Sequence, residues 1–312
     1  GMLAEGSVFD QVFTRDAVRF IQQEHLQPFY MTLSLINPHD ICKVLGGKVA
    51  GATIADAIFF CRTDDELYLR FSERPKLPDT HAVEPLAGMY RSKDYMYEEL
   101  KNWSEDEWQR YLAAYCLLIE KTDWYIEHVL NALRDAGLED NTIVMFTTDH
   151  GEMVGSHGLI SKTIFYEASA KTMMLIRHPQ RITATSVDTQ SLISTQDIMP
   201  TLLDMCNVEI PKGLDGHSFK SCCYGEQADD FSRLVSVNHD GRMVRYQHYK
   251  YIHSYIDGEH HHILFDLEAD PQESYNVYAQ MGYEEISEQL RSWLDNWLVE
   301  QDLTVVFDPV GS

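Results

Sequence analysis

Three stretches of the chain carry apolar residues at the spacing of an α-helix. Residues 10–25 predict an amphipathic helix, with apolar side chains at helical spacing at Phe9, Val12, Phe13, Phe20 and Ile21. A longer helix is predicted to begin at Ser104, where the sequence SEDE forms a capping box, and to end before Gly137. A last helix is predicted near the C-terminus, with apolar side chains on one face at Ile286, Leu290, Trp293 and Trp297.

Other apolar runs are short and continuous, which is typical of strands buried on both faces of a sheet. They cover residues 28–36, 143–146 and 172–176. Residues 196–206 predict a further helix with Pro200 in its first turn. Because helices and strands alternate along this part of the chain, we expect an α/β fold with a mostly parallel sheet flanked by helices.

The pattern changes after residue 210. Short alternating runs are separated by turn signals such as Asp240-Gly241 and Asp257-Gly258, which predict a small antiparallel sheet ahead of the last helix. We therefore expect an α/β core over residues 1–210 and a C-terminal α+β subdomain over residues 211–312. Residues 46–101 are rich in Pro and Tyr and predict a long surface excursion, with a hairpin that turns at Asp64-Asp65.

The charge composition of the chain indicates which kinds of binding partner are disfavoured. The chain has 312 residues, of which 49 are acidic and 25 basic, so its net charge is −24. That charge argues against binding to nucleic acid or to an anionic membrane, although a local cationic pocket can still bind a small anion. No apolar run reaches the ~18 residues of a membrane span, and no signal peptide is visible. The six cysteines show no metal-ligand spacing. Cysteine usage therefore does not indicate in which cellular compartment the protein works.

Polar side chains follow two of the predicted strands directly. Asp149 and His150 come after one strand, and His39 comes after another. The carboxyl ends of the strands are where an α/β sheet places its ligand sites. Asp149 and His150 provide an oxygen and an imidazole ligand for a divalent cation, while Lys162 and His39 could place positive charge on a bound sulfate or phosphate. The alternative is a polar loop without chemistry.

These residues carry a family resemblance. The stretch TTDHGEMVGSHGLISKTIFYEAS resembles the second signature of the sulfatase family, which belongs to the alkaline-phosphatase-like superfamily. LSLINPHD is similar to the sulfatase strand that ends in a substrate-contacting histidine. Later stretches resemble further landmarks of the family in the same order, namely DIMPTLLDM, LDGHSF and LFDLEADPQE.

The resemblance implies a role for each residue of the motif. Asp149 matches a metal-binding Asp, and His150 matches a ligand position that is Asn or His in the family, with calcium as the expected metal. Lys162 matches the lysine that contacts the sulfuryl group, and His39 matches the histidine near the leaving oxygen. His157 also lies on the motif, either as a member of the catalytic set or as a structural loop residue.

The chain departs from the family pattern at the nucleophile. Sulfatases carry an N-terminal segment with an Asp-Asp metal pair and a Cys-x-Pro-Ser-Arg or Ser-type motif, whose Cys or Ser becomes formylglycine. None of the six cysteines stands in such a motif, and Asp64-Asp65 follows the NPHD segment. The sequence therefore resembles the C-terminal part of a sulfatase, with a core truncated at its N-terminal side. We expect it to be inactive in sulfuric ester hydrolysis as an isolated chain.

Other functions stay open. A phosphatase or phosphonate-ester hydrolase of the same superfamily would use the same scaffold, and a noncatalytic remnant would bind a partner or a sulfated glycan. His260-His261-His262 could bind a metal, although its position after Asp257-Gly258 favours a solvated turn. The substrate expected for the complete enzyme is a sulfated small molecule or glycan. An incomplete sheet is expected to expose an apolar edge through which the chain self-associates.

Overall fold

The computed structural model describes residues 5–45, 48–49, 75–89, 95–226 and 231–301. The predicted hairpin around Asp64-Asp65 lies outside the described residues. The chain divides into two compact units. Unit 1 comprises Gly1–Ala82, Tyr95–Thr142 and Met153–Ser161, and unit 2 comprises Val83–Asp94, Ile143–Glu152 and Lys162–Ser312. The predicted boundary near residue 210 stays a prediction.

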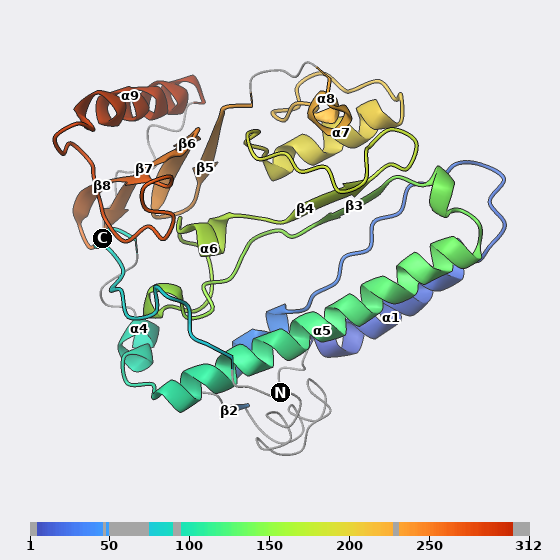
Figure 1. Cartoon of the computed structure of the whole chain (residues 1–312), viewed down its shortest axis with the longest axis horizontal. Coiled ribbons are helices and arrows are strands. Elements are labelled where there is room, and N and C mark those ends of the chain that lie inside the picture. The colour runs from blue at the N-terminus through green and yellow to red at the C-terminus, as the bar shows by residue number, and fades with distance from the viewer. Residues whose placement is uncertain (1–4, 46–47, 50–74, 90–94, 227–230, 302–312) are drawn as a thin grey trace. The chain divides into compact units, whose positions relative to one another are not determined.

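Unit 1 is built mainly from helices (Figure 1). Its described elements are α1 (Glu5–Ile21), η1 (His39–Lys43), β1 (Val44–Leu45), β2 (Lys48–Val49), α4 (Tyr95–Leu100), α5 (Glu105–Asp135), η2 (Glu139–Asn141) and η3 (Ser156–Gly158). The long helix α5 confirms the sequence prediction at both ends. Ser104 N–H donates to the Glu107 carboxylate at 2.8 Å, and Glu107 N–H donates to Ser104 Oγ at 3.3 Å. After the helix, Gly137 adopts the left-handed conformation with φ +68°.

Helix α1 forms where it was predicted, but its buried face differs from the prediction at Phe9 and Phe13. Phe9 and Phe13 stack on each other and stay 43% and 40% exposed. The buried side of α1 runs through Asp10, Thr14, Ala17 and Ile21, of which Ile21 was among the predicted apolar positions. Helix α1 packs along α5 (Figure 1), and the buried Asp10 accepts hydrogen bonds from the backbone.

The run over residues 28–36 was predicted to be a strand of a parallel sheet, and this was wrong. No strand pairs with it in the part of the chain that the structure describes. Its end is held by a side chain instead, since Ile36 N–H and Asn37 N–H donate to Asp10 at 2.7 and 3.0 Å. The carboxylate thereby takes the place that carbonyl groups of a neighbouring strand would have filled.

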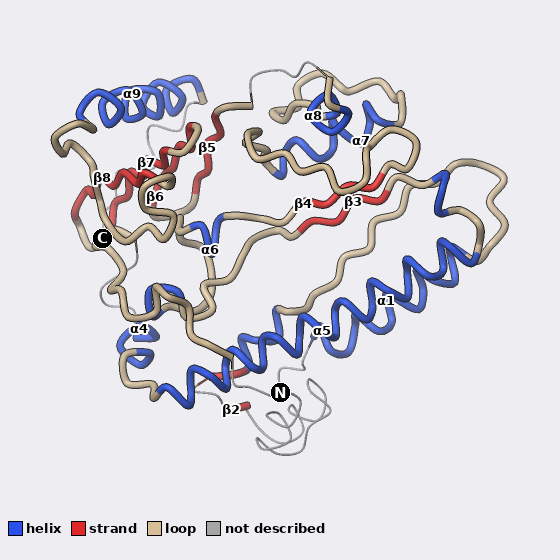
Figure 2. Tube along the Cα trace, viewed as in Figure 1, coloured by secondary structure: helices blue, strands red, loops and turns tan. Residues whose placement is uncertain are grey.

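Unit 2 contains the other described elements. They are β3 (Val144–Thr147), α6 (Glu167–Ala170), β4 (Met174–Arg177), η4 (Thr195–Asp197), α7 (Ile198–Met205), α8 (Lys220–Tyr224), β5 (Arg233–Val237), β6 (Gly241–Tyr246), β7 (Tyr249–Ile256), β8 (Glu259–Asp266) and α9 (Glu284–Glu300). Strands β3 and β4 lie side by side (Figure 2) and pair antiparallel, with Val144 opposite Arg177. The expected parallel pairing and full burial of this strand were therefore wrong, since β3 is only half-buried. An antiparallel partner needs no crossover helix.

The antiparallel sheet near the C-terminus confirms the sequence prediction. Its strand order is β5-β6-β7-β8, and the turn between the last two strands has positive φ at Asp257 and Gly258. Helix α9 packs on this sheet through a cluster of buried side chains, Val244, Tyr251, Leu264, Leu290, Leu294 and Leu298. The run His260-His261-His262 lies in β8 and pairs with β7, so the interpretation as a solvated turn was wrong. No helix in the described part of the chain combines the length and apolar character that crossing a membrane requires.

Candidate active site

The candidate metal ligands lie directly after β3, in unit 2. The side chain of Asp149 is 86% exposed, so its carboxylate is open to solvent. One carboxylate oxygen accepts the backbone N–H of His150 at 2.9 Å, and the other lies 3.4 Å from His150 Nε2. The strand ends here because the polar residues Thr148, Asp149 and His150 replace the apolar run. The two adjacent residues thus turn their oxygen and nitrogen atoms toward each other.

The protonation of the His150 ring follows from its contact with the backbone. Nδ1 lies 2.7 Å from the Gly151 carbonyl oxygen. A carbonyl oxygen can only accept a hydrogen bond, so Nδ1 carries the proton that it donates. In the neutral ring, Nε2 then keeps its lone pair and faces Asp149. A backbone carbonyl that fixes the tautomer in this way is the usual partner of a metal-binding histidine.

The spacing of these two atoms fits a shared cation. Two ligands at right angles around calcium lie about 3.3–3.7 Å apart, given metal–oxygen distances of 2.3–2.6 Å. Asp149 Oδ2 and His150 Nε2 are separated by 3.4 Å. Among the described residues, no group of three or more His, Cys, Asp or Glu gathers around one point. Asp149 and His150 therefore provide two neighbouring ligand positions.

The loop that follows is held by close backbone contact with α6. Gly151 N–H donates to the Ser169 carbonyl at 2.8 Å. A Cβ atom at Gly151 would lie 2.1 Å from the Ala168 carbonyl oxygen, which no side chain can tolerate. Glycine is thus required by this contact, and α6 fixes the position of the residue whose carbonyl orients His150.

Lys162 lies in the loop that leads to α6, and its side chain is half-buried. The next residue, Thr163, has φ +77°, and its carbonyl accepts a hydrogen bond from Asn238 Nδ2 at 2.7 Å. No carboxylate among the described residues lies within ion-pair distance of Lys162. Its ammonium group can therefore bind an external anion.

His39 and His157 belong to unit 1. His39 is exposed and begins η1, and its Nδ1 lies 3.9 Å from Cys42 Sγ. His157 is only 3% exposed, has φ +55°, and donates its backbone N–H to the Thr80 carbonyl at 3.2 Å. The burial of His157 favours the structural alternative for that residue, whereas the exposure of His39 leaves its ring accessible.

The sequence patterns missed two fully buried carboxylates beside His39. Asp10 holds the backbone of residues 36 and 37, and Asp40 accepts the N–H of Gly6 at 3.2 Å. Burial raises the pKa of Asp10 above its ordinary value. The signal that could have found Asp10 is an acidic residue on the same side of α1 as Thr14 and Ala17.

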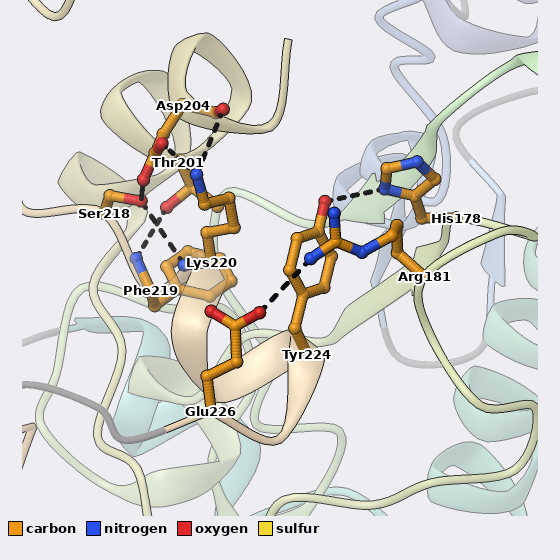
Figure 3. Close-up of polar contacts among 9 residues, drawn as sticks. All are labelled: His178, Arg181, Thr201, Asp204, Ser218, Phe219, Lys220, Tyr224 and Glu226. Atoms are coloured by element: carbon orange, nitrogen blue, oxygen red, sulfur yellow. Dashed lines mark hydrogen bonds and ion pairs between the residues drawn. The ribbon is translucent and has the colours of Figure 1, made fainter. Parts of the chain in front are cut away.

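Two groups of polar contacts in unit 2 meet at α8, one with the residues after β4 and one with α7 (Figure 3). Tyr224 Oη lies 2.8 Å from His178 Nδ1, and the guanidinium of Arg181 stacks 4.4 Å from the Tyr224 ring while pairing with Glu226. Burial and the charge of Arg181 lower the pKa of His178. Each charged residue of the first group has a partner, as do Lys220, Asp204 and Ser218 of the second, so these contacts serve to brace the two helices.

Known proteins resemble the chain over nearly its whole length. The profile of the Sulfatase family matches residues 3–208, and that of the C-terminal region of N-sulphoglucosamine sulphohydrolase matches residues 155–300. The first match starts about 30 residues ahead of the NPHD segment, so the resemblance extends further toward the N-terminus than expected. A Delta 4,5-hexuronate-2-O-sulfatase of Bacteroides thetaiotaomicron is 28% identical, with 94% of this chain and 61% of that protein covered.

Solved structures share the fold. A 2-O GAG sulfatase superposes with a TM-score of 0.78 at 24% identity, over 95% of this chain and 64% of the other. A phosphonate monoester hydrolase of Agrobacterium radiobacter superposes with a TM-score of 0.69 at 18% identity, over 96% and 62%. This chain therefore spans less than two thirds of each of these proteins. The likeness shows a sulfatase-like α/β fold, and because the family profile covers more than half of the residues, the chain belongs to the sulfatase family.

Proposed function

We propose that this chain supplies the metal-binding and sulfate-binding residues of a sulfuric ester hydrolase. The observation that carries the proposal is the pairing of Asp149 with His150. The tautomer fixed by Gly151 leaves Nε2 free to share a cation with the carboxylate 3.4 Å away. That arrangement fits a divalent metal, with calcium expected from the family.

Each residue then has a defined task. Asp149 and His150 hold the metal, which when bound draws electron density from a sulfuryl oxygen. Lys162 places its ammonium on the negative charge of the sulfate group. For His39, which is exposed, the family resemblance supports the task of protonating the departing alcohol oxygen. For His157, which is buried, we propose that it holds the loop around η3 in shape.

The attacking group has no candidate in this sequence. None of the six cysteines stands in the Cys-x-Pro-Ser-Arg motif from which the family forms formylglycine. We therefore propose that the chain does not hydrolyse sulfuric esters by itself. For the substrate class we propose a sulfated glycan. This rests on the names of relatives, which include a hexuronate-2-O-sulfatase and a sulfatase in complex with D-glucosamine-2-N,6-O-disulfate.

Metal binding and turnover test the proposal together. In calorimetric titration the chain is expected to bind calcium weakly, on the order of 10⁻⁴–10⁻³ M, because it offers only part of a coordination sphere. Asp149→Ala should abolish that binding, whereas Asp215→Ala, at an exposed position of the same unit, should preserve it. Binding that persists in Asp149→Ala would place the metal elsewhere and defeat the proposal.

Turnover separates the alternatives. With an aryl sulfate, we expect no hydrolysis above background from the purified chain. Hydrolysis that disappears in Asp149→Ala would mean that the chain contains its own nucleophile. Faster hydrolysis of an aryl phosphonate ester than of the sulfate would favour a phosphonate-ester hydrolase instead. Absence of any metal binding would leave a noncatalytic remnant as the better description.

A further inference from the structure

A fully buried lysine lies in unit 2, outside the residues assigned to the site. Lys250 of β7 has a side-chain exposure of 0%. Its ammonium donates to the Phe165 carbonyl at 2.7 Å and to the Glu167 carboxylate at 2.8 Å, and it pairs with Glu273. The ammonium therefore donates two hydrogen bonds and forms an ion pair with a third oxygen atom, on Glu273.

The charges around Lys250 balance. Arg245 lies opposite Lys250 on the neighbouring strand and adds a second cation, while Glu167 and Glu273 are the two anions. Burial opposes the ionisation of Glu167, yet the charge of Lys250 lowers its pKa below the ordinary value. Burial raises the pKa of Glu273. The cluster is thus a compact arrangement of opposite charges inside the unit.

The contacts of this cluster converge on α6. Lys250 binds the carbonyl of Phe165, two residues ahead of the helix, and Glu273 accepts the backbone N–H of Glu167 at 2.6 Å. The N-terminal start of α6 is therefore fixed by residues 83 to 106 positions away in the sequence. The same helix then accepts Gly151 N–H at the Ser169 carbonyl.

We propose that Lys250, Glu167 and Glu273 form a clamp that positions Gly151, and through it the His150 ring, for metal binding. The path has three steps. The clamp holds α6, α6 holds the Gly151 backbone, and the Gly151 carbonyl sets the tautomer of His150. These are positioning residues, since none of them touches the metal site directly. As a statement about metal binding, the inference rests on the proposed function.

A purely structural role would not require charge. A buried ion pair is on average no more stabilising than apolar residues of the same volume, whereas its directional hydrogen bonds fix geometry. The clamp uses that directionality, because Lys250 binds a carbonyl oxygen and a carboxylate at the same time. The expected effect of losing it is therefore on the position of α6 more than on overall stability.

The experiment removes the clamp without leaving an unbalanced charge. The full chain carrying Lys250→Met and Glu273→Gln loses one cation and one anion, and Glu167 keeps Arg245 as its counter-charge. The matched control removes another lysine–carboxylate pair of the same unit by Lys220→Met with Asp204→Asn, which links α8 to the end of α7 (Figure 3). Thermal unfolding reports whether both variants fold.

Two measurements follow. Hydrogen exchange at the Gly151 amide is expected to accelerate about 10-fold or more in the clamp variant and to stay unchanged in the control. The affinity for terbium, used as a luminescent substitute for calcium, should fall by about 10-fold or more in the clamp variant only. Asp149→Ala provides the background for that titration.

The amide measurement needs neither metal nor substrate, so it tests the clamp even if the proposed function fails. Unchanged protection of Gly151 in a folded clamp variant would overturn the inference. Terbium affinity within twofold of the parent, at a site that Asp149→Ala abolishes, would also overturn it. If the clamp variant does not fold, Glu273→Gln alone is the second variant, because it keeps Lys250 paired with Glu167. It is expected to show a smaller acceleration at Gly151, and no acceleration would count against the clamp.

Discussion

His253 is packed among other rings on the face of the sheet that α9 partly covers. Its ring stacks on His262 with centroids 4.5 Å apart, and its Nε2 lies 3.1 Å from His260 Nδ1. Burial lowers the pKa of His253 to about 4, and the positive charges of Arg242 and Arg291 act in the same direction as the neighbouring histidines. Burial and these charges therefore disfavour the protonated ring in the folded chain, whereas the ring of the unfolded chain is free of both effects.

This arrangement predicts acid sensitivity. Near pH 5 the unfolded chain binds a proton at residue 253, where the ordinary pKa is about 6.5, while the folded chain does not. The contribution is fully present above about pH 6.5 and is lost as the pH falls toward 4. We expect the free energy of unfolding, measured with urea, to be lower at pH 5 than at pH 7.5 by about 1 kcal/mol, because partial solvent exposure reduces the roughly 2 kcal/mol that a fully effective shift of this pKa would give.

Substituting His253 tests whether this residue causes the loss of stability at acidic pH. His253→Gln keeps a polar group of similar reach but cannot titrate, so the difference between pH 5 and pH 7.5 should shrink. His128→Gln, at an exposed position of α5, should leave the difference as large as in the parent. An equal difference in all three proteins would contradict the assignment to His253.

At the level of secondary structure, the next prediction concerns the buried carboxylate of α1. Asp10 accepts two backbone N–H groups, and an amide in its place can accept only through one oxygen while its NH₂ faces a donor. We expect Asp10→Asn to lower the free energy of unfolding by about 1–3 kcal/mol, as measured by urea denaturation. Asp16→Asn on the exposed side of the same helix should change it by less than about 0.5 kcal/mol. Similar values for both would mean that Asp10 does not hold residues 36 and 37.

Local signals in the sequence account for the elements that were predicted well. The capping box at Ser104 and the Asp257-Gly258 turn each depend on a few neighbouring residues, and both form as expected. The strand predicted over residues 28–36 failed because strand formation needs a partner, which no local pattern supplies. The buried face of α1 differed from the prediction at Phe9 and Phe13 because a carboxylate contact with a distant backbone outweighed the burial of two phenylalanines.

In the candidate site, too, some features follow from neighbouring residues in the sequence and others require the folded structure. Asp149, His150 and Gly151 are consecutive, so the sequence alone placed the two proposed metal ligands beside each other. The clamp around Lys250 joins Glu167 to residues that lie 83 and 106 positions further along the chain, and no local sequence pattern near Glu167 or Glu273 predicts these contacts. Predicting such contacts requires the fold, because they exist only once β7 and α6 are packed.

At the scale of the whole molecule, two properties oppose each other. A net charge of −24 keeps copies of the chain apart at low ionic strength. Strand β4, in contrast, is paired only with β3 in the part of the chain that the structure describes, and its Leu175 is 59% exposed. An apolar strand with an unpaired edge favours association with another strand. The balance therefore depends on salt, which screens the charge and leaves the apolar contact intact.

The last prediction concerns this balance. We expect light scattering to give a mass above the 36.0 kDa of one chain, rising with protein concentration and more so at 0.5 M salt, an ionic strength at which repulsion acts over only about 4–5 Å. Leu175→Lys should restore the single-chain mass, because it places a charge on the exposed strand, as natural edge strands do. Val187→Lys, at another exposed apolar position of the same unit, should not. A clean monomer at all concentrations and salt levels would show that the edge is covered or too short to pair.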